Sequence, residues 1–444
     1  MPLAIVLLAR IAQAQPTLDM LVSFLPFNTV EANPYAEMTL GNDGNFYGTT
    51  SDGNNNVGTV FQLATSGTLT LLASFNYTNG ANPFAGLTLG SDGKFYGTTY
   101  SGGSNGYGAP GTVFQITTNG TLATLVNFNG TNGANPTAAL ALGNDGNFYG
   151  TTEYGGISGY GTAFQMTSDG ILTTLVSFNG TNGAYPMAEL TLGSDGNLYG
   201  TTSEGGSFGD GTVFQVTTNG TLTTLANFNG TNGTYLSSGL ALGSDSNFYG
   251  TTEYGGDSGF GTVFQITTNG ILTTLANFNG TNGAYPQAKL TLASDGCFYG
   301  TTFGGGYNNG NIFRVTTNGT LSALVNFSGT NGSWPMAALA IGNDGNFYGT
   351  TEEGGVTYNG ENVGAGTLFK FILPPAINSF SLSNHVPTTA VSGLARPSVQ
   401  IQATTNLLSS WFVLTNLVFT NGISQFTDTA ATNSPTRFYR AMVQ

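Results

Sequence analysis

The sequence predicts an all-β protein: a seven-bladed β-propeller with four-stranded blades, whose N-terminal strand closes the last blade, plus a small C-terminal β-sandwich-like module. Three observations support this fold class. A segment like Asn147–Thr152 occurs seven times, at intervals of 49 to 53 residues. Each repeat contains four short apolar runs separated by turn residues, as a propeller blade does. The fourth run occurs once before the first repeat and is missing from the last.

The repeat at residues 136–186 shows why each strand is expected. Asp145-Gly146 and Asp169-Gly170 supply the positive φ values that tight turns require, and a glycine-rich loop lies between them. Threonine and apolar residues alternate without a consistently polar face, which indicates sheets covered on both sides by neighbours. The strands, called a to d, are predicted at residues 139–142, 147–152, 162–167 and 171–178.

The ends of the repeat region indicate a closed ring. Residues 17–24 align with strand d of the model repeat, and no strand a, b or c precedes them. Residues 366–371 have the pattern of strand c, and Pro374-Pro375 follows where strand d is expected. We therefore expect the first strand to complete the last sheet, which gives seven blades.

Three regions are expected along the chain. Residues 1–15 contain a short apolar run and the small-x-small pattern of Ala12–Ala14, and they predict a truncated signal peptide. Residues 16–373 form the propeller, and residues 374–444 form the C-terminal β module. No run approaches 18 apolar residues, so no membrane-spanning segment is expected. The predicted location is secreted or at a cell surface.

The charge distribution excludes one class of partner. The repeat region from residue 17 to 371 contains 21 Asp and Glu but only four Lys and Arg. An acidic body of this kind repels phosphate backbones, so no nucleic-acid partner is expected. The single cysteine, Cys297, cannot form an intrachain disulfide, and we interpret it as a small side chain in a turn.

The repeat resembles the GloVer tandem repeat of bacterial secreted and surface proteins. The motifs that carry the resemblance are Asp195–Thr202, Gly205-Gly206, Gly211–Gln215 and Asn229-Gly230, and they recur throughout residues 17–371. This resemblance implies an extracytoplasmic bacterial protein with no established activity. The C-terminal segment also resembles a module that closes many secreted proteins of similar bacteria.

The candidate ligand-binding residues lie on the longer b–c and d–a loops, which we expect on one face of the propeller. Function in a rigid scaffold usually resides on such loops. Aromatic rings beside carboxylates could bind an extracellular glycan or a protein, although the rings could equally cover blade edges. The candidates are Glu153, Tyr154, Tyr160, Tyr185, Glu204, Glu253, Tyr254, Phe260, Tyr285, Trp334, Glu352 and Glu353.

Other sites receive less support from the sequence. The aspartates of the a–b turns suggest calcium, but an Asp-Gly turn has a sufficient backbone reason, so neither a metal nor a cofactor is expected. His385 is the only histidine, and no catalytic residue is assigned. The favoured function is a non-catalytic binding or surface-interaction scaffold. The alternatives are a polysaccharide-acting hydrolase or lyase that uses carboxylates on the loop face, and a purely structural surface or matrix protein.

Overall fold

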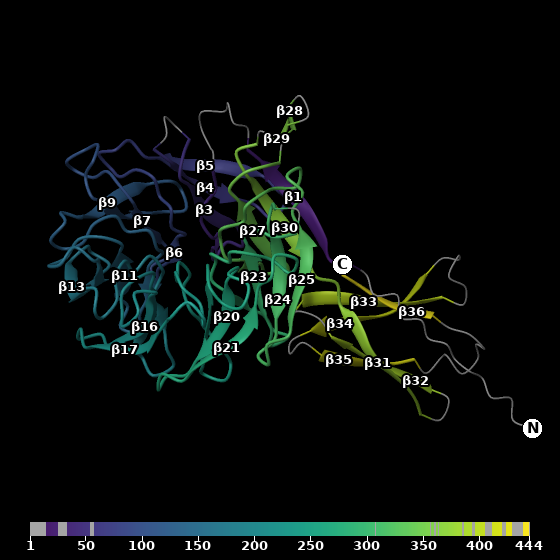
Figure 1. Ribbon diagram of the computed structural model, residues 1–444. Coiled ribbons are helices and arrows are strands. Elements are labelled where there is room, and N and C mark those ends of the chain that lie inside the picture. The colour runs from purple at the N-terminus through teal and green to yellow at the C-terminus, as the bar shows by residue number, and fades with distance from the viewer. Residues whose placement is uncertain are drawn as a thin grey trace, which may run out of the picture.

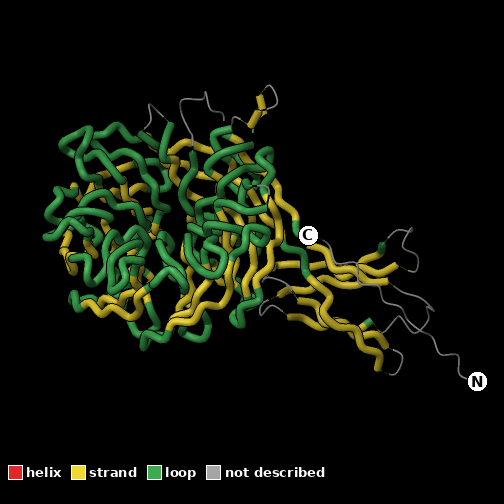
Figure 2. Tube along the Cα trace, viewed as in Figure 1, coloured by secondary structure: helices red, strands yellow, loops and turns green. Residues whose placement is uncertain are grey.

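The computed structural model describes most of the chain. The described residues are 15–24, 33–53, 57–306, 308–355, 357–358, 361–362, 364–383, 386–392, 396–404, 411–419, 423–428 and 438–443. Every regular element among them is a β-strand (Figure 2). The predicted signal peptide lies almost entirely outside the described residues, as does His385.

Seven four-stranded antiparallel sheets form the body of the molecule, as predicted. The a strands are β2 (Thr39–Leu40), β6 (Thr88–Leu89), β10 (Ala141–Leu142), β14 (Thr191–Leu192), β18 (Ala241–Leu242), β22 (Thr291–Leu292) and β26 (Ala340–Ile341). The b strands are β3 (Phe46–Thr50), β7 (Phe95–Thr99), β11 (Phe148–Thr152), β15 (Leu198–Thr202), β19 (Phe248–Thr252), β23 (Phe298–Thr302) and β27 (Phe347–Thr351). We number the blades 1 to 7 in this order.

The outer two strands complete each blade. The c strands are β4 (Thr59–Leu63), β8 (Thr112–Ile116), β12 (Thr162–Met166), β16 (Thr212–Val216), β20 (Thr262–Ile266), β24 (Asn311–Val315) and β30 (Thr367–Ile372). The d strands are β5 (Leu69–Ser74), β9 (Leu122–Asn127), β13 (Leu172–Ser177), β17 (Leu222–Asn227), β21 (Leu272–Asn277), β25 (Leu321–Asn326) and β1 (Thr17–Ser23). The a strands are shorter than predicted, because the residues before them follow the wall of a central channel instead of pairing with strand b.

The ring closes through β1, which pairs antiparallel with β30 and so supplies strand d of blade 7 (Figure 1). Thr17 lies opposite Ile372, and Ser23 lies opposite Thr367. The Thr350 hydroxyl of blade 7 donates a hydrogen bond to the Ala36 carbonyl of blade 1 (3.3 Å). The predicted circular closure is confirmed.

Aromatic pairs hold neighbouring blades together. The tyrosine of strand b contacts the first residue of strand b in the next blade, as in Tyr47–Phe95, with ring centroids 4.1 Å apart. Tyr348 of blade 7 contacts Phe46 of blade 1 at 4.3 Å, which continues the series across the closure. Blade 4 differs because Leu198 replaces the phenylalanine. These rings are fully buried, and burying each contributes roughly 1.5–3 kcal/mol.

The remaining strands include two features outside the blades. A hairpin of β28 (Thr357–Tyr358) and β29 (Glu361–Asn362), which the sequence did not predict, lies in the b–c loop of blade 7. The C-terminal segment forms two three-stranded sheets, β31-β32-β35 and β34-β33-β36, in agreement with a small β module (Figure 1). Their strands are β31 (Ala376–Ser383), β32 (Val386–Ser392), β33 (Arg396–Thr404), β34 (Phe412–Phe419), β35 (Ile423–Thr427) and β36 (Phe438–Val443). The domain boundaries given above stay predictions.

Candidate functional site

The b–c and d–a loops form one continuous rim. The amide of Ala184, in the d–a loop that leads into blade 4, donates to the Glu204 carbonyl in the b–c loop of that blade (2.8 Å). The next residue, Tyr185, donates its amide to the Tyr160 carbonyl of blade 3 (3.0 Å). Each d–a loop is thus held between two successive b–c loops, which gives the rim a fixed backbone on which side chains can be positioned.

Four aromatic residues on this rim have a left-handed backbone conformation. Tyr185, Tyr235, Tyr285 and Trp334 have φ between 55° and 58°. Blades 1 to 3 place Asn33, Asn82 and Asn135 at the same position, with φ of 54° to 56°. Asparagine tolerates this region, whereas a bulky side chain there is uncommon and costs free energy. The aromatic residues in blades 4 to 7 therefore need a reason other than backbone geometry.

The predicted aromatic side chains pack on one another around the rim. Tyr185 contacts Tyr154 at 5.4 Å and Tyr160 at 5.7 Å between ring centroids. Two blades further along the chain, Tyr285 contacts Tyr254 at 5.4 Å and Phe260 at 5.6 Å. Trp334 stacks on Phe303 at 5.3 Å. The rings support each other, yet Tyr154 remains 39% exposed and Tyr254 43% exposed, so each also offers a face to a ligand.

Three predicted glutamates occupy one position of the repeat, directly after strand b. Burial raises the pKa of Glu153, Glu253 and Glu352 above the usual value. Burial followed by the charges of Glu253 and Glu153 raises the pKa of Tyr235, so both carboxylates lie near this tyrosine although their blades are not adjacent. Glu204 and Glu353, one position later in the repeat, are more exposed.

One small pocket brings several predicted residues together. It has a volume of about 280 Å³, and its lining residues come from blades 3 to 5. They are Glu153, Tyr154, Tyr185, Met187, Ser203, Glu204 and Tyr235. Tyr160, Glu253, Tyr254, Phe260, Tyr285, Trp334, Glu352 and Glu353 do not line it and are distributed over the rest of the rim.

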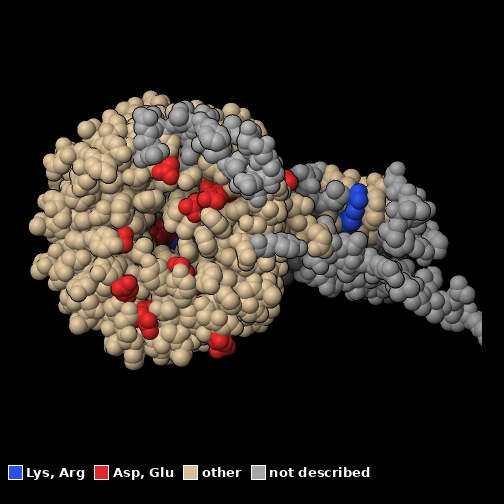
Figure 3. Space-filling model, turned by 45° about the horizontal axis from the view of Figure 1, so that its top comes forward, with Lys and Arg blue, Asp and Glu red and all other residues tan. Residues whose placement is uncertain are grey.

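A larger cavity of about 940 Å³ occupies the central channel and reaches the rim at Glu153 and Tyr100. Figure 3 shows acidic side chains around and within the hollow at the centre of this face. Each blade contributes to the channel wall through at least three of the four residues that precede its a strand. The third of these residues is Gly86, Ala139, Gly239 or Ala338 in four blades and Glu37, Glu189 or Lys289 in the other three.

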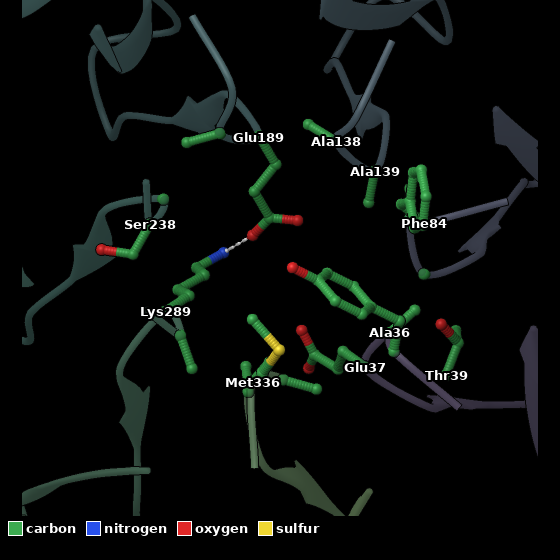
Figure 4. Close-up of a pocket in the computed structure, with 18 of the residues that line it drawn as sticks. Ala36, Glu37, Thr39, Phe84, Ala138, Ala139, Glu189, Ser238, Lys289 and Met336 are labelled. Atoms are coloured by element: carbon green, nitrogen blue, oxygen red, sulfur yellow. Dashed lines mark hydrogen bonds and ion pairs between the residues drawn. The ribbon is translucent and has the colours of Figure 1, made fainter. Parts of the chain in front are cut away.

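These three charged side chains, which the sequence analysis did not single out, converge inside the channel. Lys289 forms an ion pair with Glu189, and Glu37 enters from the opposite side (Figure 4). Gly239 leaves room for Glu189, because a Cβ atom there would lie 2.8 Å from the Glu189 Cγ atom. The signal that could have found them is charge at a repeat position that is otherwise Gly or Ala.

The charged groups of the channel shift the pKa values of Glu37 and Lys289. Burial and the negative charge of Glu189 raise the pKa of Glu37 to about 7, and the positive charge of Lys289 only partly opposes this shift. For Lys289, burial lowers the pKa, but the attraction of Glu189 and Glu37 outweighs burial and raises it. Lys289 is therefore charged at neutral pH, while Glu37 titrates close to neutrality.

The turn aspartates that suggested calcium have another role. The Tyr149 hydroxyl donates to Asp145 Oδ2 (2.8 Å), and Gln165 Nε2 donates to the Tyr149 hydroxyl (2.7 Å). Burial alone would raise the pKa of Asp145, but hydrogen bonds from Tyr149 and Asn147 outweigh it and lower the pKa. Among the described residues, no group of three or more His, Cys, Asp or Glu side chains could hold a metal ion.

No membrane-crossing helix occurs in the described part of the chain. Cys297 is buried, as expected for a small turn side chain, and Arg314 Nη2 donates to its Sγ atom (2.8 Å).

Several solved structures have a similar fold at low sequence identity. The extracellular domain of a hybrid two-component system from B. thetaiotaomicron is 11% identical, with a TM-score of 0.51. The match covers 94% of this chain, which spans about half (54%) of that chain. A gluconolactonase from Xanthomonas campestris is also 11% identical, with a TM-score of 0.42, and the match covers 82% of this chain and 97% of that one.

The family comparison covers more than half of the chain. No protein with a curated description matches the sequence. The model of the Gloeobacter/Verrucomicrobia repeat matches residues 7–193 and 189–386, which include all seven blades. This agrees with the resemblance stated above on the motifs of the repeat. The chain belongs to the Gloeobacter/Verrucomicrobia repeat family.

Proposed function

We propose that this protein is a non-catalytic binding scaffold whose rim binds a carbohydrate chain. The observation that carries the proposal is the left-handed backbone of Tyr185, Tyr235, Tyr285 and Trp334. Strained backbone of this kind is concentrated at functional sites. In four consecutive blades an aromatic residue adopts this backbone conformation, which asparagine adopts at lower cost in the other three blades.

The chemistry of the rim suits a sugar. Exposed aromatic faces such as Tyr154 and Tyr254 can stack on the C–H face of a sugar ring. The carboxylates of Glu153 and Glu253 lie next to these rings and can accept hydrogen bonds from sugar hydroxyls. The pocket between blades 3 and 5 is large enough for one sugar ring, and the rest of the rim could hold further units of the chain.

An extracytoplasmic location is part of the same proposal. The sequence of residues 1–15 and the resemblance to repeats of secreted and surface proteins support it. Detection of the mature protein in the culture medium or on the cell surface tests this part, and retention in the cytosol would contradict it.

A glycan array tests the function directly. Wild-type protein should bind a subset of glycans, and the double variant Tyr154→Ala/Tyr254→Ala should lose at least tenfold in affinity, because each stacking face contributes on the order of 1 kcal/mol. Phe208→Ala is the matched control: Phe208 is 65% exposed on a b–c loop but lines neither cavity, so its removal should change nothing. No glycan binding by the wild type would favour a purely structural surface protein.

The channel supports one second candidate function, a polysaccharide-acting hydrolase. Two carboxylates, Glu37 and Glu189, enter the same cavity, and the pKa of Glu37 is raised to about 7. In such an enzyme Glu37 would protonate the leaving oxygen while Glu189 accepts a proton from the attacking water. Release of reducing ends from polysaccharides, abolished by both Glu37→Gln and Glu189→Gln, would establish this function. An absence of product with every polysaccharide tested leaves the binding scaffold as the better account.

A further inference from the structure

We propose that the central channel binds a small organic cation, a primary or quaternary amine, through the carboxylate of Glu37. This site lies inside the channel and does not depend on the proposed binding of a carbohydrate at the rim.

The pairing of charges in the channel leaves one carboxylate uncompensated. Glu189 and Lys289 neutralise each other in an ion pair. Among the described residues, Glu37 accepts no hydrogen bond and forms no ion pair, although its side chain projects into the cavity beside Met336 (Figure 4). A half-buried carboxylate without a hydrogen-bond partner is costly to keep charged, and a cation that enters the channel would reduce this cost.

The walls around Glu37 provide both space and a suitable surface. The equivalent residues of the two adjacent blades are Gly86 and Ala338, so neither adjacent blade places a long side chain at this position of the repeat. Three aromatic rings of the channel wall form a continuous series, with Tyr35–Phe84 and Phe84–Tyr100 centroid distances of 5.4 Å each. Aromatic faces attract ammonium groups, most strongly where water is excluded.

The same features disfavour an inorganic divalent ion. Calcium takes six to eight oxygen ligands and magnesium six, usually with more than one carboxylate. Of the two glutamates that precede an a strand in the channel wall, Glu189 is paired with Lys289, which leaves Glu37, and the described residues contain no group of three metal-ligand side chains. One carboxylate with aromatic and apolar walls instead suits a single ammonium group on a small apolar body.

The rim would guide cations toward this site. Glu153, Glu253 and Glu352 lie after strand b in blades 3, 5 and 7, and Glu153 also lines the channel. The described lining of the cavity contains two glutamates besides Glu153 and only one cation, Lys289. A channel lined by one sign of charge concentrates ions of the opposite sign.

The test is isothermal titration of the full-length protein at pH 8 with choline chloride, with its uncharged analogue 3,3-dimethylbutan-1-ol, and with calcium chloride. Choline should bind, and the neutral analogue should bind at least tenfold more weakly. Glu37→Gln should reduce choline affinity at least tenfold, and Tyr35→Leu should reduce it several-fold. Asp169→Asn, which changes an exposed carboxylate in the c–d turn of blade 3 outside both cavities, is the control and should leave affinity unchanged.

Lys289→Met gives the sharpest outcome. Removal of Lys289, the only cation in the described lining of the channel, releases Glu189, so choline should bind several-fold more tightly, the opposite of the effect of Glu37→Gln. The Tyr154→Ala/Tyr254→Ala variant should retain choline binding, which separates failure of this site from failure of the rim.

Equal affinity for choline and its neutral analogue, tighter binding of calcium than of choline, or wild-type affinity in Glu37→Gln would overturn the proposal. If Lys289→Met does not fold, as judged by circular dichroism, Glu37→Gln and Tyr35→Leu still decide it.

Discussion

Four aromatic residues at the rim have backbone angles that asparagine or glycine would adopt at lower cost. Tyr185 illustrates the balance: its φ is 55°, yet its ring contacts Tyr154 and Tyr160. The ring contacts contribute roughly 0.5–1.5 kcal/mol each, and the left-handed backbone costs about 1–2 kcal/mol. The two effects nearly cancel, so the tyrosine adds little to stability, and we attribute its presence to binding.

The strain can be measured by comparing two truncations. Tyr185→Ala loses both ring contacts and keeps a Cβ atom at positive φ, whereas Tyr185→Gly loses the contacts and relieves the strain. We expect Tyr185→Gly to be more stable than Tyr185→Ala by about 1 kcal/mol in urea unfolding. At Met187, whose φ is not positive, the same pair should show the reverse order, because glycine there only adds flexibility to the unfolded chain. Equal stabilities of the two Tyr185 variants would mean that the position is unstrained.

Glu37 gives the protein a pH-dependent stability near neutrality. Its pKa is higher in the folded protein than the usual 4.5, so its contribution to stability is complete below that pH and is lost as the pH rises through about 7. We expect the wild-type melting temperature to fall between pH 5 and pH 8. Over the same pH range, the free energy of unfolding of Glu37→Gln should fall by about 1–3 kcal/mol less than that of the wild type, since each pKa unit corresponds to about 1.4 kcal/mol.

The comparison is made by differential scanning calorimetry at both pH values. Glu353→Gln serves as the control, because Glu353 is an exposed carboxylate on the same face. An identical decline in the wild type and in Glu37→Gln would show that Glu37 titrates in its ordinary range.

At the scale of the element, strand b owes its Phe-Tyr-Gly-Thr-Thr sequence to two contacts. The tyrosine packs against the next blade, and the glycine lies under the phenylalanine of strand c. In blade 4, a Cβ atom on Gly200 would lie 2.5 Å from Phe214 Cζ, which is too close for two carbon atoms that are not bonded to each other. The glycine of the repeat motif is therefore explained by the close approach of two strands and not by a need for backbone flexibility.

Gly200→Ala should destabilise the propeller by about 1–3 kcal/mol, as overpacking of a well-packed core does. The double variant Gly200→Ala/Phe214→Leu should be less destabilised than the sum of the two single variants, because the smaller side chain removes the clash. Urea unfolding of the four proteins measures this coupling. Additive effects would mean that the glycine is required for its backbone conformation alone.

The strands could be predicted because their signals are local. Asp145-Gly146 sets a turn, and the alternating residues on either side define the strands that it joins. The a strands were overestimated, since Ala139 and Leu140 have the composition of a strand but belong to the channel wall. The hairpin of β28 and β29 was missed because it is an insertion in one blade and has no counterpart in the repeat.

At the scale of the whole molecule, the channel site could not be predicted from single repeats. Glu37, Glu189 and Lys289 belong to blades 1, 4 and 6, and each stands alone in its own repeat. Only closure of a seven-membered ring brings the same position of distant repeats to one axis. The position of the rim could be predicted, because strand direction alone assigns the b–c and d–a loops to one face.

Closure is the central claim, since both proposed sites exist only if β1 completes blade 7. A disulfide between Thr17→Cys and Ile372→Cys, in a Cys297→Ser background, tests it most directly, because these residues are opposed in the β1–β30 pair. Opposed antiparallel residues have Cα atoms within the range that a disulfide spans. Thr17→Cys combined with Asn219→Cys, in the c–d turn of blade 4, is the control.

We predict that the Thr17–Ile372 pair oxidises to near completion in the folded protein. By closing a loop of more than 300 residues, it should raise the free energy of unfolding by up to about 5 kcal/mol. The control pair should remain reduced. Failure of the opposed pair to cross-link in the folded state, or cross-linking of both pairs to the same extent, would contradict the closed ring.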